Sequence, residues 1–92
     1  FQPDPQRFPC LKLAYQSIEI GETMPAILNA ANEVAVNAFL EGSLKFTEIP
    51  ILLQRVMQEH EVKPVHTIED ILRADHWARE RSKTILEGRK LC

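Results

Sequence analysis

The densest run of apolar residues lies between Thr23 and Gly42 and predicts one long helix. Thr23 or Met24 suits its N-cap, and Pro25 suits its first turn, where a missing N–H costs no hydrogen bond. Gly42 favours the left-handed conformation that ends a helix, so the helix should end at Glu41. Placed at roughly 100° per residue, its apolar side chains fall on nearly every side, which is typical of a buried helix. The sequence therefore predicts a central, buried helix.

A shorter segment from Pro9 to about Ile20 predicts the first helix, because its apolar residues recur at helical spacing and Gly21 follows it. Its core face should carry five residues: Cys10, Leu13, Ala14, Ser17 and Ile18. Residues 1–8 contain two prolines, each of which biases the preceding residue toward extended structure. We therefore expect an extended arm or linker at 1–8 and one helical domain at 9–92.

Two stretches in the second half of the chain predict the remaining helices. Thr47 is a good N-cap, with Phe46 and Ile51 at the spacing of a hydrophobic staple. Thr67 and Asp75 are caps in quick succession, which predicts a short helix of about two turns and then a last helix. The inward residues of these segments should be Ile49, Leu52, Leu53, Val56 and Met57, and then Trp77, Ala78, Ser82 and Ile85. The pattern predicts an all-α fold, a compact four- to five-helix bundle around the central buried helix.

Composition adds few constraints and excludes some functions. The 92 residues allow one domain, and 45% apolar with 26% charged residues is ordinary for a globular protein. A net charge of −2 offers no basic field for nucleic acid, and no apolar run is long enough for a membrane span. The two cysteines, Cys10 and Cys92, favour reduced thiols in a cytosol-like compartment over a single disulfide. Because the chain begins without Met, we expect a piece of a longer protein.

Catalytic, cofactor and metal sites are not predicted from these residues. His60, His66 and Asp70 could be imagined around a metal ion, but they lack ligand spacing and are separated by a Lys63-Pro64 turn. Cys10 is expected to be a small packed side chain rather than a nucleophile. No glycine-rich phosphate loop or dinucleotide fingerprint is present in the sequence.

Three polar residues of the central helix, Asn29, Asn32 and Glu33, stand out because that helix otherwise looks too apolar to face water. Buried polar groups need hydrogen-bond partners. These side chains could form a seam for a partner or ligand, or they could bond backbone groups at loop ends or at an adjoining domain. We favour the second interpretation.

Four runs form a distinctive combination: Arg7-Phe8-Pro9-Cys10-Leu11; Pro25-Ala26-Ile27-Leu28-Asn29-Ala30-Ala31-Asn32-Glu33; Phe46 with Ile49-Pro50; and Ile68-Glu69-Asp70-Ile71-Leu72 with Trp77-Ala78-Arg79. In this order they resemble the C-terminal portion of 1-deoxy-D-xylulose 5-phosphate reductoisomerases, over essentially the whole chain. The resemblance implies a homodimeric oxidoreductase of non-mevalonate isoprenoid (terpenoid) biosynthesis, in the bacterial cytoplasm or the plastid stroma. Such an enzyme uses NADPH and a divalent cation (Mg²⁺, Mn²⁺ or Co²⁺) to make 2-C-methyl-D-erythritol 4-phosphate.

The resemblance also implies a division of labour. The family's dinucleotide-binding and catalytic domains precede its C-terminal helical bundle and hold the NADPH, metal and phosphate sites, so no such residue is assigned to this chain. The fragment itself is expected to be inactive and to brace the catalytic domain, with Asn29, Asn32 and Glu33 bonding locally and across the joint. The alternative is a free-standing helical interaction module whose apolar seam receives a partner helix.

Overall fold

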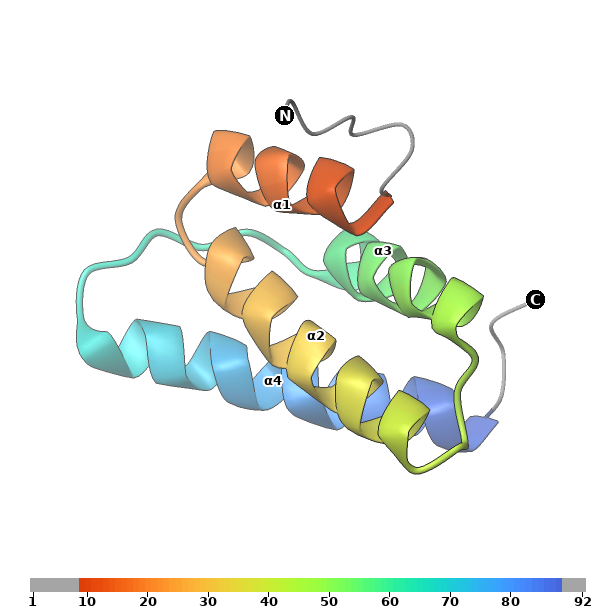
Figure 1. Ribbon diagram of the computed structural model, residues 1–92. Helices are drawn as coiled ribbons and strands as arrows, with labels where there is room; N and C mark the ends of the chain where they lie inside the picture. Colours follow the sequence, from red (N-terminus) through yellow and green to blue (C-terminus); the bar gives the residue numbers. More distant parts are fainter. Residues whose placement is uncertain (1–8, 89–92) are drawn as a thin grey trace.

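The computed structural model describes residues 9–88, which form four α-helices, a short 3₁₀ helix and no strand (Figure 1). The all-helical prediction is confirmed, while the expected arm at 1–8 lies outside the described residues. The elements in chain order are α1 (Pro9–Ile20), α2 (Met24–Leu40), η1 (Phe46–Glu48), α3 (Ile49–Glu59) and α4 (Ile68–Gly88).

The second helix, α2, is the centre of the bundle and packs against α1, α3 and α4. In Figure 1 it crosses the middle of the molecule in front of α4, with α1 and α3 above it. Small side chains on its inner side let the neighbouring helices approach closely. Its buried residues are Met24, Ile27, Ala30, Ala31, Ala35 and Ala38. The predicted central position of this helix is therefore confirmed.

The prediction that α2 is buried on nearly every side is wrong. Its outer side is exposed, and it includes apolar Val36 and Leu40, whose residues are 37% and 74% accessible. Neither side chain belongs to the apolar core of residues 9–88, which lies on the inner side of α2. The spacing of apolar residues alone could not distinguish the side of α2 that faces the core from the side that faces solvent.

Glycines end α1 and α2 as predicted. Gly21 and Gly42 have φ of +72° and +84°, a conformation that side chains with a Cβ rarely adopt. At the end of α2, the N–H of Gly42 donates to the carbonyl of Phe39 and the N–H of Ser43 donates to that of Ala38. These two bonds form a Schellman motif, which satisfies carbonyls that the helix would otherwise leave unpaired.

The predicted N-cap of α3 at Thr47 is wrong, because the chain first makes the 3₁₀ helix η1. Lys45 precedes η1, and its N–H donates to the Glu48 carboxylate at 2.9 Å. Phe46 is 70% exposed and lies edge-on to Phe39 at a ring-centroid distance of 5.7 Å. The extra turn moves the start of α3 to Ile49, so the staple inferred from a Thr47 cap loses its register. The predicted buried face of α3 is confirmed in full.

The last segment is one helix, so the predicted break at Asp75 is wrong. The Asp75 carboxylate does not cap a helix but accepts a hydrogen bond from Arg79 one turn later. The start at Thr67 is confirmed, since the Asp70 carboxylate accepts the N–H groups of His66 and Thr67. The predicted inward residues Ala78, Ser82 and Ile85 are buried, together with Ala74, and Trp77 packs against the core.

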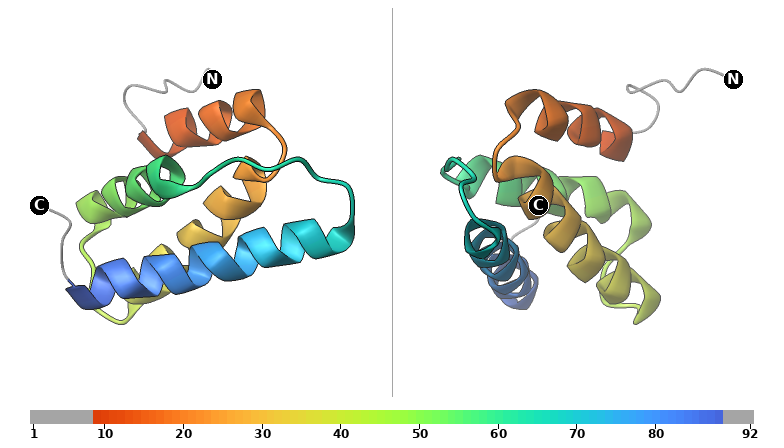
Figure 2. Two further views of the ribbon diagram at one scale, coloured as in Figure 1. Left: turned by 180° about the vertical axis from the view of Figure 1, so that it is seen from behind. Right: turned by 90° about the vertical axis from the view of Figure 1, so that its left-hand side faces the viewer.

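The first helix buries a narrower face than expected. Leu13 and Ser17 are buried, whereas Cys10 is exposed and Ile18 is 69% exposed, so both are corrections to the predicted core face. The physical reason is the position of α1, which lies at the edge of the described bundle and packs mainly on α2 and α3 (Figure 2). The left view of Figure 2, which is seen from behind, shows the first turns of α4 extending past α2.

Candidate functional site

The three predicted residues lie together on the exposed outer side of α2. Asn29, Asn32 and Glu33 are all exposed and share this side with Val36, Asn37 and Leu40. The spacing of three, four, seven, eight and eleven residues from Asn29 keeps them in one stripe along the helix. We call this stripe the outer face of α2. The polar residues are thus explained by exposure rather than by burial.

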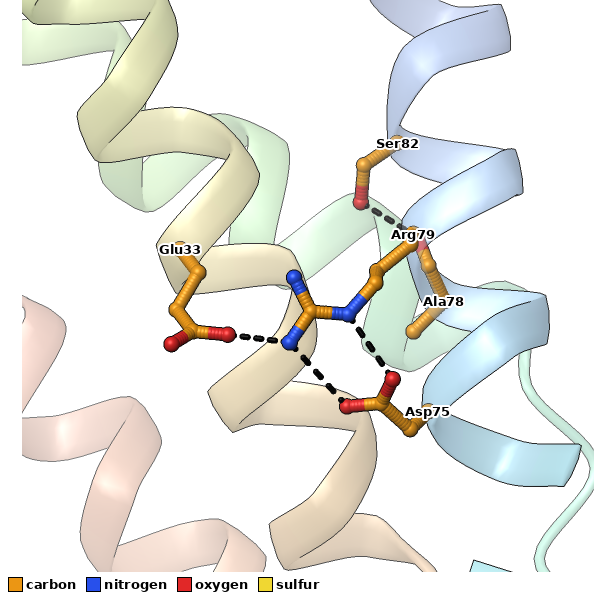
Figure 3. A network of polar contacts seen from close by, with 5 residues as sticks. All are labelled: Glu33, Asp75, Ala78, Arg79 and Ser82. Carbon is orange, nitrogen blue, oxygen red and sulfur yellow. Dashed lines mark hydrogen bonds and ion pairs between the residues drawn. The ribbon is translucent and has the colours of Figure 1, made fainter. Parts of the chain in front are cut away.

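Glu33 joins the outer face of α2 to α4 through Arg79. The Arg79 guanidinium donates to the Glu33 carboxylate and also to Asp75, with Nε to Oδ2 at 2.8 Å (Figure 3). The hydrogen bonds that Arg79 donates to Asp75 and then to Glu33 raise the pKa of Arg79. The side chains of Glu33 and Arg79 are 51% and 35% exposed, so the pair contributes about 0–1 kcal/mol, as is usual for surface ion pairs. This contact supports local bonding for Glu33.

The two asparagines differ from Glu33 in their side-chain contacts. Within residues 9–88, neither the Asn29 nor the Asn32 side chain makes a hydrogen bond to another residue. Asn32 borders two hollows. The first, about 250 Å³, is lined by Cys10, Ala14, Pro25, Leu28, Asn29, Asn32 and Leu53. The second, about 310 Å³, is lined by Asn32, Glu33, Val36, Asn37 and Arg79.

The other candidate constellations are not assembled. Among the described residues, no group of three or more His, Cys, Asp or Glu side chains is placed to hold a metal ion. His60 faces Thr23, whereas Asp70 binds backbone N–H groups at the start of α4. Although Cys10 is exposed as a residue, partial burial of its thiol raises the pKa of that group, which disfavours the reactive thiolate.

Two contacts were not predicted from the sequence. Arg79 binds both Asp75 and Glu33; the i, i+4 spacing of Asp75 and Arg79 could have predicted the first contact, but not the second. The side chains of Thr23 and His60 are hydrogen-bonded although they lie 37 positions apart in the sequence, and no local sequence pattern predicts such a contact.

The sequence matches the family model of the DXP reductoisomerase C-terminal domain over residues 1–81. The chain belongs to this family. Among its curated relatives is the 1-deoxy-D-xylulose 5-phosphate reductoisomerase of Chlorobium phaeobacteroides, 52% identical over 86 residues, which are 94% of this chain and 22% of the relative. The reductoisomerase of Geobacter metallireducens is 55% identical over 84 residues, 91% of this chain and 22% of that protein.

A solved structure gives the same family. The 1-deoxy-D-xylulose 5-phosphate reductoisomerase of Zymomonas mobilis, in complex with NADPH, is 36% identical with a TM-score of 0.88. The match covers 95% of this chain and 23% of that one. The resemblance inferred from the sequence is therefore confirmed, and the chain spans 22% of the length of the first curated relatives. Within residues 9–88, no helix is long and apolar enough to cross a membrane.

Proposed function

We propose that this chain is the C-terminal helical domain of an NADPH-dependent reductoisomerase that converts 1-deoxy-D-xylulose 5-phosphate into 2-C-methyl-D-erythritol 4-phosphate. The observation that carries the proposal is the match of nearly the whole chain to 22% of each reductoisomerase. The complete enzyme would be a homodimer in the bacterial cytosol or plastid stroma and would serve isoprenoid biosynthesis.

The cofactor and the metal belong, in this proposal, to the remainder of the enzyme. The described residues offer no three-ligand metal cluster, and the hollows beside α2 are lined by amides, apolar side chains and the Glu33–Arg79 ion pair. These residues do not fit a divalent cation or a dinucleotide, so we assign none of them to NADPH or to Mg²⁺, Mn²⁺ or Co²⁺. The chain therefore contributes support rather than chemistry.

The outer face of α2 is the surface that we assign to the catalytic domain. Asn29 and Asn32 each present an amide donor and an amide acceptor to solvent, next to apolar Val36 and Leu40. An amide pair can bind the backbone of a neighbouring segment while apolar residues around it exclude water. Glu33 would hold α4 against α2 and so fix the orientation of this surface.

The test is Asn32→Ala in the full-length enzyme. We expect a lower melting temperature with a smaller change in kcat/KM, because the residue supports the joint and does not touch the substrate. In the 92-residue chain alone the same substitution should change stability by less than about 0.5 kcal/mol, as is usual for an exposed side chain. Gln58→Ala, an exposed substitution on α3, is the matched control and should be neutral in both proteins.

Two results would contradict this role. Equal destabilisation of the isolated chain and the full-length enzyme would give Asn32 a purely local function. Loss of turnover with an unchanged melting temperature would place Asn32 beside the chemistry.

A further inference from the structure

The connection between α3 and α4, residues 60–67, is fastened to the turn between α1 and α2 by polar contacts. The Thr23 hydroxyl oxygen lies 2.8 Å from Nε2 of His60 and accepts the N–H of Lys63 at 3.1 Å. The carboxylate of Glu22 accepts the N–H of Val65 at 2.9 Å. The irregular connection is therefore held at three successive points, two of which use one hydroxyl group.

His60 is the first residue of the 60–67 connection and makes the first of these polar contacts. It is the C-cap of α3, and its ring lies against that of Trp77 in α4 at a centroid distance of 5.1 Å. Thr23 precedes α2 and is only 2% exposed, yet its hydroxyl makes no capping bond to that helix. The Thr23–His60 pair thus links the beginning of α2 to the end of α3 and, through the ring contact, to α4.

The hydrogen positions in this pair follow from what the Thr23 hydroxyl must satisfy. Its oxygen already accepts the N–H of Lys63, so its own hydrogen needs an acceptor. Among the described residues, Nε2 of His60 is the partner in place. The hydroxyl would then donate to Nε2 of a neutral ring that carries its hydrogen on Nδ1. The opposite assignment would leave a buried hydroxyl hydrogen unpaired, which is costly.

We propose that His60 is a pH-operated latch, which in its neutral form holds the 60–67 connection on the α1–α2 turn and on protonation loosens it. A second ring hydrogen on Nε2 would face the Thr23 hydroxyl hydrogen, and the hydroxyl would have to turn away from its acceptor. The hydrogen bond that fastens the connection would be lost in its present form.

The surrounding charges act in both directions. Burial and then the positive charge of Lys63 lower the pKa of His60, while Glu61 raises it. The face of Trp77 also favours a cation. Glu22 on the α1–α2 turn and the Glu59–Arg81 ion pair between α3 and α4 are further charged groups on the adjoining elements. His76 precedes Trp77 on α4 and is exposed.

Thermodynamic linkage relates the pKa of His60 to the free energy of opening the 60–67 connection. Once the connection is released, His60 should titrate near its ordinary pKa of about 6.5. Each unit by which the closed latch lowers that pKa must weaken closure about tenfold when the ring becomes protonated. The titration of His60 and the opening of the connection are therefore two measurements of one free energy.

The experiment combines both measurements on the folded chain. The ring protons of the three histidines are titrated by NMR, and amide hydrogen exchange of Lys63 and Val65 is measured between about pH 7.5 and 5.5, above the range in which carboxylates titrate. We expect His60 to titrate below 6.5 and the protection factor of Lys63 to fall with it, by the factor that linkage requires. His60 titrating at or above 6.5, or Lys63 protection that ignores its titration, would overturn the proposal.

Matched variants separate the latch from general effects of acid. His60→Gln should remove the pH dependence of Lys63 protection, whereas His66→Gln and His76→Gln, at exposed positions, should retain it. Thr23→Val should bring the pKa of His60 back toward 6.5, and Thr23→Ser, which keeps the hydroxyl, should preserve the latch. Helix content by far-UV circular dichroism confirms that each variant is folded. A pH dependence that survives in folded His60→Gln would also overturn the proposal.

Discussion

Gly42 carries a conformational requirement that one substitution can measure. Its φ is +84°, and a Cβ added there would meet no heavy atom within 4 Å, so backbone strain is the dominant cost of a side chain. We expect Gly42→Ala to lower the free energy of unfolding by about 1 kcal/mol, as is usual for a left-handed residue. Urea denaturation of the folded chain provides the measurement.

Gly42→Asn is the comparison for that experiment, because asparagine tolerates the left-handed region better than alanine does. It should cost less than the alanine variant in spite of its larger side chain. If alanine were neutral, or if asparagine were the worse of the two, steric or solvent effects rather than backbone strain would decide this helix end.

At the scale of the element, α4 depends on a charged cap at its start. The Asp70 carboxylate accepts the N–H groups of His66 and Thr67 at 2.9 and 3.0 Å, and these two backbone bonds are the leading causes that lower its pKa. A lowered carboxyl pKa contributes stability that is present above the ordinary value near 3.8 and is lost as the pH falls through the folded value.

We therefore expect the melting temperature of the wild-type chain to fall more steeply below pH 4 than that of Asp70→Asn. At neutral pH the variant should be less stable, because an amide is a weaker acceptor than a carboxylate. Thermal melts followed by circular dichroism between pH 3 and 7 provide the test, with exposed Glu80→Gln as the control. Parallel pH curves for the wild type and Asp70→Asn would contradict the assigned role of this cap.

The elements also show how far sequence patterns reach. Helix existence and the glycine stops followed from local chemistry, since Gly21 and Gly42 act within their own turns. The boundary at Thr47 failed because the chain first makes the 3₁₀ helix η1, and the boundary at Asp75 failed because a good capping residue is also a good partner for other groups. Asp75 binds Arg79 within a continuous helix, and Thr23 uses its hydroxyl for His60 instead of for α2. Such competition is decided by tertiary packing, which local sequence does not record.

The candidate site was predictable to the extent that it depends on helical spacing. Asn29, Asn32 and Glu33 lie on one side of α2 because their positions in sequence require it. Which side of α2 faces solvent could not be predicted, since it depends on where α1, α3 and α4 pack. The partner of Glu33 was missed for the same reason, because Arg79 lies 46 positions away.

At the scale of the whole molecule, the exposed surface of the bundle fits the supporting role proposed above. The bundle encloses an apolar core at the inner side of α2, and the hollows that Asn32 borders are lined by exposed amides, apolar side chains and the Glu33–Arg79 ion pair. Several large apolar side chains remain outside this core, among them Leu40, Phe46 and Ile68 at 70–74% exposure. Exposed apolar residues of this kind suit a domain that packs against further protein.

This division of labour predicts that the 92-residue chain alone does not oxidise NADPH when it is given 1-deoxy-D-xylulose 5-phosphate and Mg²⁺ or Mn²⁺. The physical reason is that catalysis needs the cation, the cofactor and the substrate held together, and the described residues provide no cluster for the first of these. Absorbance at the nicotinamide band provides the measurement, with the full-length enzyme as the positive control. Turnover by the isolated chain that disappears after heat unfolding would show that this bundle contains a reaction centre, and the supporting role would then have to be abandoned.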